Sequence, residues 1–281
     1  MKLLRFGPPG RERPGILDAA GVIRDASSLV TDWAGEALSP AGLDRIRAVD
    51  PAGLPAVPPG VRLGPPVAGT RNFVAIGLNY ADHAAETGAP IPKEPIVFLK
   101  SLNAIAGPDD DIVLPPGSVK TDWEAELAFC VGTRAKNVPE ERAMEHIAGF
   151  LICNDVSERE WQTERGGTWD KGKGADGYGP LGPWLVTPDE VPDPQDLAIR
   201  CEVDGEVMQD GSTRTMIFGV AHLLSYVSRF ITLHPGDIVT TGTPPGVGLG
   251  KKPQPIYLRP GNVVRVSITG LGVQTQRVVQ G

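Results

Sequence analysis

Glycine and proline interrupt this sequence so often that only short secondary-structure elements fit between them. The chain has 35 glycines and 28 prolines among its 281 residues, a combined fraction below the roughly 25–30% that is typical of low-complexity chains. Short apolar runs lie between these turn residues, as in proteins built from β-strands. The pattern therefore predicts a compact fold with many turns, in a chain long enough to bury a sizeable core.

The charge of the chain argues against several classes of protein. The net charge is -7 and the isoelectric point is about 5.2, whereas a nucleic-acid-binding protein is expected to carry a basic patch. No apolar run approaches the roughly 20 residues of a membrane-spanning helix, and the first residues lack the apolar stretch of a secretory signal. The three cysteines, Cys130, Cys153 and Cys201, are far apart and flanked by apolar residues. We expect buried, reduced thiols in a cytoplasmic protein that binds neither nucleic acid nor membranes.

The sequence divides near residue 69. Residues 1–68 contain a predicted strand at residues 2–6 and a predicted helix at residues 39–49, where Ser39 and Pro40 form a helix-start signal. A stretch rich in proline and glycine then leads into residue 69. These features predict a small N-terminal α/β domain over residues 1–68 and a larger domain over residues 69–281.

Strand signals dominate the larger domain. Apolar runs predict strands at residues 73–78, 96–99, 112–114, 123–131, 147–153, 184–187, 199–203 and 238–241, and apolar residues alternate with polar ones at residues 264–268. Asp204-Gly205 is a typical two-residue hairpin turn. One amphipathic helix is predicted from apolar residues at positions 217, 220, 224, 227 and 231. Many strands with few helices favour an α+β, mainly β fold over a βαβ wound sheet.

Several well-known motifs are absent. The segment Gly246-Val247-Gly248-Leu249-Gly250-Lys251 resembles a nucleotide-binding loop, but Lys251 stands where the dinucleotide fingerprint needs glycine, and Pro245 stands where a phosphate loop needs it. The chain also lacks Gly-x-Ser-x-Gly, Cys-x-x-Cys and His-Glu-x-x-His, which argues against a serine nucleophile elbow and against common zinc sites.

An acidic pattern predicts a metal site. Glu124 and Glu126 are two residues apart in a predicted strand, so they share one face. This pair alone also fits a solvated edge, where charged residues of strands usually lie. A third carboxylate, Asp155, follows Asn154 at the abrupt end of another apolar strand. Three carboxylates form an all-oxygen ligand set that suits Mg²⁺ or Mn²⁺.

Polar residues downstream could hold an anionic substrate beside such a cation. Arg159 and Gln162 are three residues apart and share a face on a helical turn. Lys173 lies between two glycines, which would allow a ligand to approach closely. Thr243 lies in a Thr-Gly-Thr-Pro-Pro-Gly segment after a strand. That segment is either an ordinary turn or a loop that offers a hydroxyl and backbone amides to a carboxylate.

A histidine and a glutamate suggest a general base. His83 and Glu86 are three residues apart in a short predicted helix that Asn79 or Asp82 could cap and Gly88 could end. A carboxylate bonded to one imidazole nitrogen strengthens the other nitrogen as a base. A plain surface ion pair is the alternative interpretation. The other histidines, His146, His222 and His234, are expected to be structural and to lack an acidic partner.

Taken together, these segments resemble the fumarylacetoacetate hydrolase family. The matching segments follow the family's order and include GLNYADHAAETG, DWEAELAFCVG, GFLICNDVSEREWQ, KGKGADGYGPLGPW, MQDGSTRTMIF and HPGDIVTTGTPPGVG. The resemblance implies a strongly bent sheet that forms a β-roll, usually in a homodimer, and the first 68 residues look like the N-terminal domain of the bacterial acylpyruvase and ureidoglycolate lyase-like branch. Many relatives have Asp-Thr-Phe after the lysine, whereas this chain has Asp176-Gly177-Tyr178. The change adds a phenol and is expected to affect substrate shape.

The resemblance also implies roles for the candidate residues. Metal ligands for Mg²⁺ or Mn²⁺ are Glu124, Glu126 and Asp155. The dyad on a lid over the substrate is His83 and Glu86. Residues that hold substrate or complete the metal's surroundings are Arg159, Gln162, Lys173 and Thr243.

The leading hypothesis is metal-dependent hydrolysis of a carbon–carbon bond in an acylpyruvate-like 2,4-diketo acid, with Lys173 and the cation stabilising a pyruvate enolate. An oxaloacetate-type decarboxylase, a keto-diacid isomerase or a ureidoglycolate lyase would use the same site, since the site does not determine the substrate. A non-catalytic, metal-braced binding protein is the alternative of another class, but it would need no base such as His83.

Overall fold

Two sheets make up most of the protein, which is described here from a computed structural model. The structure describes residues 1–281, apart from the side chain of Thr87. The larger sheet has 11 strands, and nine of them form the path β3-β2-β1-β13-β11-β10-β16-β5-β6, while β4 pairs with β1 and β7 with β13. The smaller sheet has five strands in the order β15-β14-β17-β18-β8. The expected mainly β fold is confirmed.

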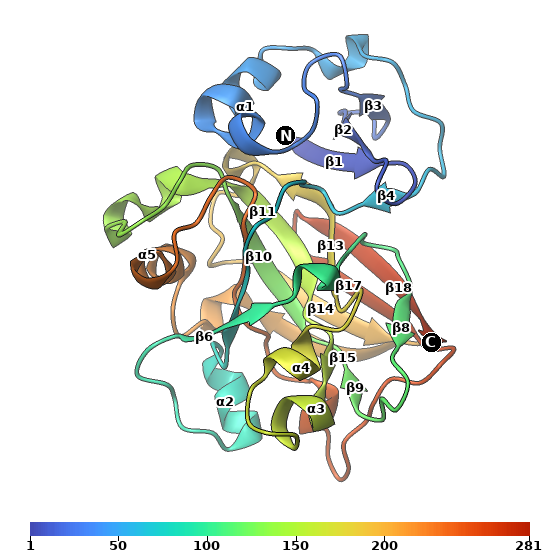
Figure 1. The fold of residues 1–281 in the computed structure, drawn as a ribbon, viewed down its shortest axis with the longest axis vertical. Coiled ribbons are helices and arrows are strands. Elements are labelled where there is room, and N and C mark those ends of the chain that lie inside the picture. Colours follow the sequence, from blue (N-terminus) through green and yellow to red (C-terminus); the bar gives the residue numbers. More distant parts are fainter.

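The N-terminal strands extend the larger sheet (Figure 1). Their bounds are Lys2–Phe6 for β1, Arg13–Leu17 for β2, Ile23–Asp25 for β3 and Leu63–Gly64 for β4. Helix α1, Pro40–Arg47, begins after Ser39, whose side chain accepts a hydrogen bond from the N–H of Gly42. Strand β1 pairs antiparallel with β13, so residues 1–68 are joined to the rest by backbone hydrogen bonds. The domain boundary at residue 69 stays a prediction.

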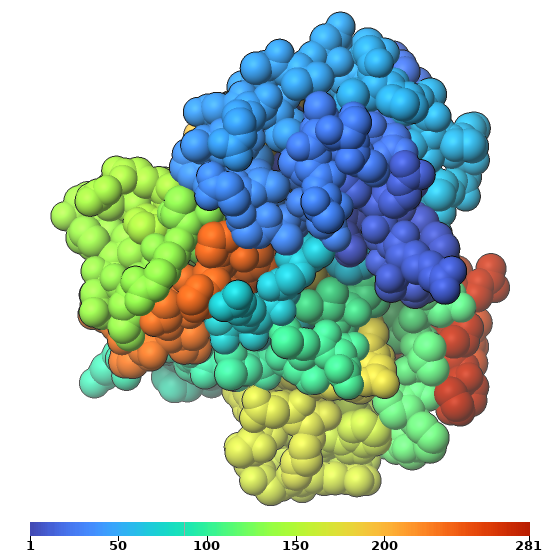
Figure 2. Space-filling view, turned by 45° about the horizontal axis from the view of Figure 1, so that its top comes forward, coloured from blue at the N-terminus to red at the C-terminus, as the bar shows by residue number. Residues whose placement is uncertain are grey.

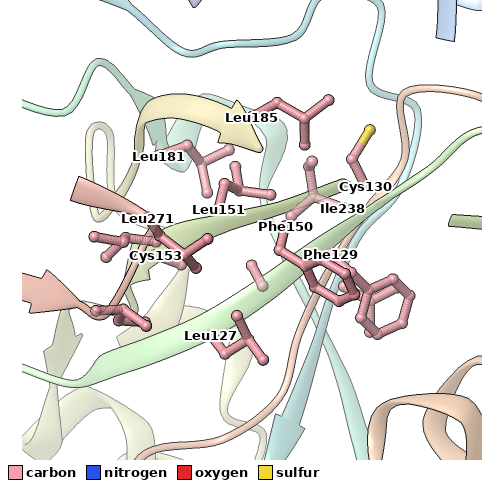
Figure 3. Close-up of a cluster of buried hydrophobic side chains, with 14 of the residues drawn as sticks. Leu127, Phe129, Cys130, Phe150, Leu151, Cys153, Leu181, Leu185, Ile238 and Leu271 are labelled. Atoms are coloured by element: carbon pink, nitrogen blue, oxygen red, sulfur yellow. The ribbon is translucent and has the colours of Figure 1, made fainter. Parts of the chain in front are cut away.

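The remaining strands of the larger sheet contain the central core. They are β5 (Phe73–Gly77), β6 (Ile96–Lys100), β7 (Ile105–Ala106), β10 (Ala125–Val131), β11 (Ile147–Asn154), β13 (Gly179–Val186) and β16 (Ile238–Thr240). Every residue of β10 and β11 is buried. Figure 3 shows side chains from four of these strands packed together, among them Leu127, Phe150 and Leu181. Both faces of these strands are therefore covered, which makes their few polar residues notable.

The smaller sheet covers one face of the larger one. Its strands are β8 (Ile112–Leu114), β14 (Ala198–Val203), β15 (Glu206–Ser212), β17 (Val263–Ile268) and β18 (Gly272–Gln280). Strands β14, β17 and β18 pack against β10, β11 and β13. The predicted hairpin turn is confirmed: Asp204 and Gly205 join β14 to β15 with φ values of 52° and 83°, as a type I′ turn requires. A two-stranded pair, β9 (Thr121–Asp122) and β12 (Ser157–Glu158), lies apart from both sheets.

Three short helices gather at the end of the molecule opposite the N-terminal strands (Figure 1). They are α2 (Ala81–Thr87), α3 (Arg159–Thr163) and α4 (Asp170–Lys173). The space-filling view shows residues near 160–180 projecting at this end, while residues 1–68 cover the other (Figure 2). Each helix that the structure describes is too short or too polar to cross a membrane.

The longest helix, α5, is shorter than its apolar stripe predicts. It spans Val220–Phe230, so Ile217 and Ile231 lie outside it. Asn79 holds the preceding residues in a non-helical path, because its backbone O accepts from the N–H of Ile217 and its side chain accepts from the N–H of Phe218. The prediction is wrong at both ends of the stripe and correct for the three apolar residues between them, which are buried.

Candidate active site

Three buried carboxylates converge where β10 begins and β11 ends. Ligand oxygens of Glu124, Glu126 and Asp155 all lie within 4.8 Å of one another. The antiparallel register pairs Glu126 with Cys153 and Ala125 with Asn154. The next residue, Asp155, donates its N–H to the backbone O of Glu124 at 2.8 Å. Two strands that run in opposite directions therefore bring these carboxylates together.

Glu124 reaches the cluster in a different way from the one expected. The strand predicted to start at Trp123 starts at Ala125, so only Glu126 lies within it. The side-chain O of Asn154 accepts the N–H of Glu124 at 3.1 Å, and the carboxylate of Asp122 accepts the N–H of Trp123 at 2.8 Å. These side chains take the hydrogen bonds that a neighbouring strand would otherwise make, which is why the ladder stops before Glu124.

Three cations lie among four buried carboxylates here, because Asp122 belongs to the same cluster as the three above. The ammonium of Lys173 lies 2.6 Å from Glu124 and 2.8 Å from Asp155. The guanidinium of Arg159 lies 2.7 Å from Glu124 and 2.8 Å from Asp122. Lys100 donates to the other oxygen of Asp155 at 2.5 Å and to the backbone O of Lys173 at 2.5 Å. All three cations are buried, so these ion pairs act at short range in a dry region.

The carboxylates differ in their electrostatic environment. Burial alone would raise the pKa of Glu124, but Arg159, Lys173 and His83 together hold this pKa at about 2. Burial, Asp155 and Glu124 instead raise the pKa of Glu126 well above its usual range. The N–H of Gly242 donates to Glu126 at 3.0 Å. Glu126 is therefore the carboxyl whose ionised form is least favoured in the absence of a further cation.

Helix α2 holds the predicted histidine–glutamate pair. Nδ1 of His83 lies 3.0 Å from the carboxylate of Glu86, and that carboxylate also accepts the N–H of Gly246 at 3.0 Å. Gly88 ends the helix with φ of +69°, as expected for a left-handed cap. The prediction that Asn79 or Asp82 caps this helix is wrong, because the helix begins after Tyr80 without a side-chain cap, and the side-chain amide of Asn79 donates to the backbone O of Phe218 and Thr241.

Helices α3 and α4 carry Arg159, Gln162 and Lys173 to the same site. Arg159 donates to the side-chain O of Gln162 at 3.1 Å, so the predicted shared face is observed. The expectation that the glycines beside Lys173 leave room for a ligand is wrong. A Cβ at Gly174 would lie 2.8 Å from the backbone O of Asp170, and a Cβ at Gly172 would lie 2.5 Å from the backbone O of Glu158. Gly172 therefore allows α4 to pack closely against the preceding segment.

The loop after β16 supplies its backbone amides to the protein's own carboxylates, Glu126 and Glu86. The hydroxyl of Thr243 donates to the backbone O of Ala125 at 2.9 Å and accepts from Gln209 at 2.8 Å. The hydroxyl proton of Thr243 is therefore donated to another residue of the protein, although Thr243 lines the cavity described next.

One cavity of about 370 Å³ connects these groups, a size within the range of small-molecule sites. Its polar lining is formed by His83, Glu124, Glu126, Arg159, Gln162, Thr163, Lys173 and Thr243. Its apolar lining includes Ile76, Ile96, Phe98, Trp169 and Leu249. Asp155 contacts Lys173 and Glu86 contacts His83. The structure thus brings together every predicted site residue, whereas their roles stay predictions.

Two expectations about neighbouring residues are wrong. Tyr178 does not add a phenol to the cavity: its ring is fully buried, and its hydroxyl lies 2.8 Å from the hydroxyl of Thr121. His222 has an acidic partner, since its Nδ1 lies 2.9 Å from the carboxylate of Glu140. His222 lies on α5 and Glu140 in the 3-10 helix Glu140–His146, and neither residue lines the cavity.

Sequence reasoning missed Lys100, Asp122, Phe98 and Trp169. A signal for Lys100 was present, because a lysine directly after the apolar run at residues 96–99 resembles the Asn-Asp strand end at Asp155. Trp169 had no comparable signal, since its position follows from the packing of α4 beside β6.

A cavity in which a carboxylate-supported histidine faces a buried cluster of oxygen ligands has the features of an enzyme active site. The family model described as "Fumarylacetoacetate (FAA) hydrolase C-terminal" matches residues 72–279. The chain belongs to this family of enzymes. A Burkholderia cenocepacia protein with the name "Putative hydrolase" is 61% identical over 276 residues, which cover 98% of each chain.

Solved structures agree with this assignment. Fumarylacetoacetate hydrolase from Exiguobacterium antarcticum is 38% identical, with a TM-score of 0.89 and coverage of 100% of both chains. Maleylpyruvate hydrolase from Sphingobium sp. SYK-6, solved with manganese(II) and pyruvate, is 27% identical, with a TM-score of 0.82 and coverage of 100% of both chains.

Proposed function

We propose that this enzyme hydrolyses a carbon–carbon bond in an acylpyruvate-like 2,4-dioxo acid with the help of Mg²⁺ or Mn²⁺. The observation that carries the proposal is the shared cavity, whose lining includes His83 together with Glu124 and Glu126. The manganese and pyruvate in the Sphingobium structure support the choice of ligand class.

The donor set fits a hard divalent cation. Glu124, Glu126 and Asp155 offer only oxygen ligands, which Mg²⁺ and Mn²⁺ prefer. The environment of Glu126 also fits, because a cation would favour the ionised form of a carboxyl whose pKa burial raises. When bound, such a cation supplies Lewis acidity, which polarises the oxo groups of an oxo acid and stabilises developing negative charge.

His83 and Glu86 provide the base. When Nδ1–H of His83 donates to Glu86, the basic lone pair is on Nε2, which takes a proton from water. The water oxygen then bonds to the distal carbonyl carbon. The bond from this carbon to the methylene breaks, and its electron pair passes to the pyruvate fragment as an enolate. Protonation of the enolate gives pyruvate, and the other product is the carboxylic acid of the acyl group.

Lys173 and Arg159 complete the polar lining of the cavity. Both cations are held by carboxylates at 2.6–2.8 Å, so their positions are set before a ligand arrives. Fixed positive charge beside the site stabilises an enolate more than the neutral ketone, and only such a difference accelerates the step.

Pyruvate release from acetylpyruvate and from oxaloacetate, each with Mg²⁺ or with EDTA, tests the proposal. We expect hydrolysis of acetylpyruvate to need the metal. Glu126→Gln should lower its rate at least about 100-fold while leaving the circular dichroism spectrum unchanged. Full activity in this variant would contradict the site assignment.

A histidine variant separates hydrolysis from decarboxylation, which needs no attacking water. His83→Ala should lower acetylpyruvate hydrolysis about 10²–10⁴-fold and leave any oxaloacetate decarboxylation largely intact. His222→Ala is the matched control, because this histidine also pairs with a glutamate but lies outside the cavity. If only oxaloacetate is consumed, the decarboxylase alternative replaces the proposal.

We also propose that the enzyme forms a homodimer. Size-exclusion chromatography with light scattering would measure its mass in solution.

A further inference from the structure

The cavity lining contains two chemically different sets of residues. Most of the charged residues come from the start of β10, from α3 and from α4. The other lining is apolar and is formed by Ile76, Ile96, Phe98, Trp169 and Leu249, which we call the acyl wall. These residues come from β5, β6, the residue before α4 and a short 3-10 helix at residues 248–250, which are far apart in the sequence.

An aromatic corner in the acyl wall is closely packed. The rings of Phe98 and Trp169 meet edge to face with centroids 5.2 Å apart. Gly77 makes room for the indole, since a Cβ at this position would lie 2.4 Å from Cζ3 of Trp169. Nζ of Lys173 lies 5.3 Å from the centroid of the Phe98 ring. Phe98 thus lies beside both Trp169 and the charged residues.

Positive charge in the lining comes from few residues. Of the described residues that line the cavity, Arg159 and Lys173 are the ones with a permanent positive charge. Both are already ion-paired with Asp122, Glu124 or Asp155. Nearby, Lys171 donates to the backbone O of Arg165, and Arg165 pairs with Glu160. A second carboxylate on the substrate, placed at the acyl wall, would lose water without gaining a cationic partner, which is unfavourable.

We propose that the acyl wall is the specificity pocket of this enzyme and that it selects acylpyruvates with an uncharged alkyl or aryl acyl group over dicarboxylic ones. This inference rests on the proposed function, in which the oxo-acid head lies against the charged residues. Phe98 and Trp169 are the residues that determine specificity, because the acyl chain removes its apolar surface from water against their rings.

Two acylpyruvates of matched shape provide the test. 4-Methylpentanoylpyruvate and succinylpyruvate differ in that an isopropyl group replaces a terminal carboxylate. We expect kcat/KM, measured as pyruvate release with Mg²⁺, to be at least about tenfold higher for the alkyl compound. Across acetyl-, butanoyl- and hexanoylpyruvate, kcat/KM should rise about two- to fourfold per methylene. Equal values for the matched pair, or a preference for succinylpyruvate, would overturn the inference.

Variants locate the effect. Trp169→Ala and Phe98→Leu should flatten the dependence on chain length, so that the ratio of kcat/KM for hexanoylpyruvate to kcat/KM for acetylpyruvate falls toward one. Ile96→Lys adds a cation at a residue that is 37% exposed and should shift the ratio at least about tenfold toward succinylpyruvate. Phe230→Ala removes an aromatic ring that is 64% exposed and distant from the lining, so it should leave the ratio unchanged. A chain-length dependence that persists in both wall variants would contradict the assignment.

A binding experiment separates this inference from the proposed function. 2-Oxooctanoate and 2-oxoadipate lack the second oxo group, so the proposed reaction cannot cleave them. With Mg²⁺ present, 2-oxooctanoate should raise the melting temperature more than 2-oxoadipate does, and Trp169→Ala should remove the difference. This result without pyruvate release from any acylpyruvate would refute the function and support the pocket. If all acylpyruvates are cleaved, and neither kcat/KM nor binding favours the alkyl compound, the proposed function is supported and the specificity pocket is refuted.

Discussion

Two clusters of ion pairs in this protein each contain one more carboxylate than cations, but only one cluster is dry. The inter-segment network joins residues 1–68 to the rest and consists of Arg5, Glu12, Asp32, Arg62 and Asp110, whose side chains are 6–29% exposed. The site cluster consists of Lys100, Asp122, Glu124, Glu126, Asp155, Arg159 and Lys173. Its paired side chains are 0–8% exposed.

Water explains why the same imbalance has different consequences. In the inter-segment network, Arg62 contacts both oxygens of Asp110 at 2.6 and 2.7 Å, and solvent can screen the surplus charge. In the site cluster the paired side chains are almost fully buried, and burial together with Asp155 and Glu124 raises the pKa of Glu126. A dry cluster with unbalanced charge is suited to bind a cation, whereas a wetter one of equal charge serves to hold two segments together.

The largest expected effect is in the dry cluster. Lys100→Met leaves Asp155 without one of its cations at a site where both partners are buried. We expect the free energy of unfolding, measured with urea, to fall by about 3–5 kcal/mol. The double variant with Asp155→Asn should recover part of this loss, because it also removes the unpaired charge. A loss below about 1 kcal/mol would show that water reaches the cluster.

Metal addition should act on the dry cluster alone. Mg²⁺ or Mn²⁺ at 100 times its dissociation constant should stabilise the protein by about 2.7 kcal/mol, and EDTA should reverse the change. Calorimetric melting curves measure this effect. Glu126→Gln should remove it, whereas Asp32→Asn in the inter-segment network should retain it. Equal stabilisation of both variants would place the cation elsewhere.

The matching change in the inter-segment network should lower the free energy of unfolding by less than Lys100→Met does. Arg62→Met removes the ion pairs of Arg62 with Glu12 and Asp110. In the shorter of these contacts, the side chain of Arg62 is 27% exposed and that of Asp110 is 29% exposed. We expect a loss of about 1 kcal/mol in the urea experiment, with metal binding and turnover retained. A loss as large as that of Lys100→Met would remove the distinction between the clusters.

Salt should produce the smallest effect. Raising NaCl from about 0.1 to 1 M shortens the Debye length from about 10 to 3 Å. The destabilisation caused by Arg62→Met should then shrink by a few tenths of a kcal/mol, while that caused by Lys100→Met should change less. Unfolding curves of both variants at the two salt concentrations measure the difference. The reverse order would mean that the site cluster is the more solvated of the two.

Local sequence patterns predicted the elements that carry the site. The apolar runs at β10 and β11, the helix around His83 and Glu86, and the turn at Asp204-Gly205 all appear in the structure. These features depend on neighbouring residues, because strand alternation and turn preferences are local. The errors arose where distant groups took over backbone hydrogen bonds. Asn154 ends the strand before Glu124, and Asn79 ties the segment before α5.

The sequence by itself determined which kinds of group the site contains: oxygen ligands, a histidine with an acidic neighbour and an excess of carboxylates. The tertiary structure decided how charge and water are distributed among them. Lys100 lies 55 residues from Asp155 and Trp169 is far from Gly77 in the chain, yet packing places each pair in contact. Burial then determines whether a charge is screened or must be neutralised, and burial depends on contacts between distant segments that local patterns do not encode.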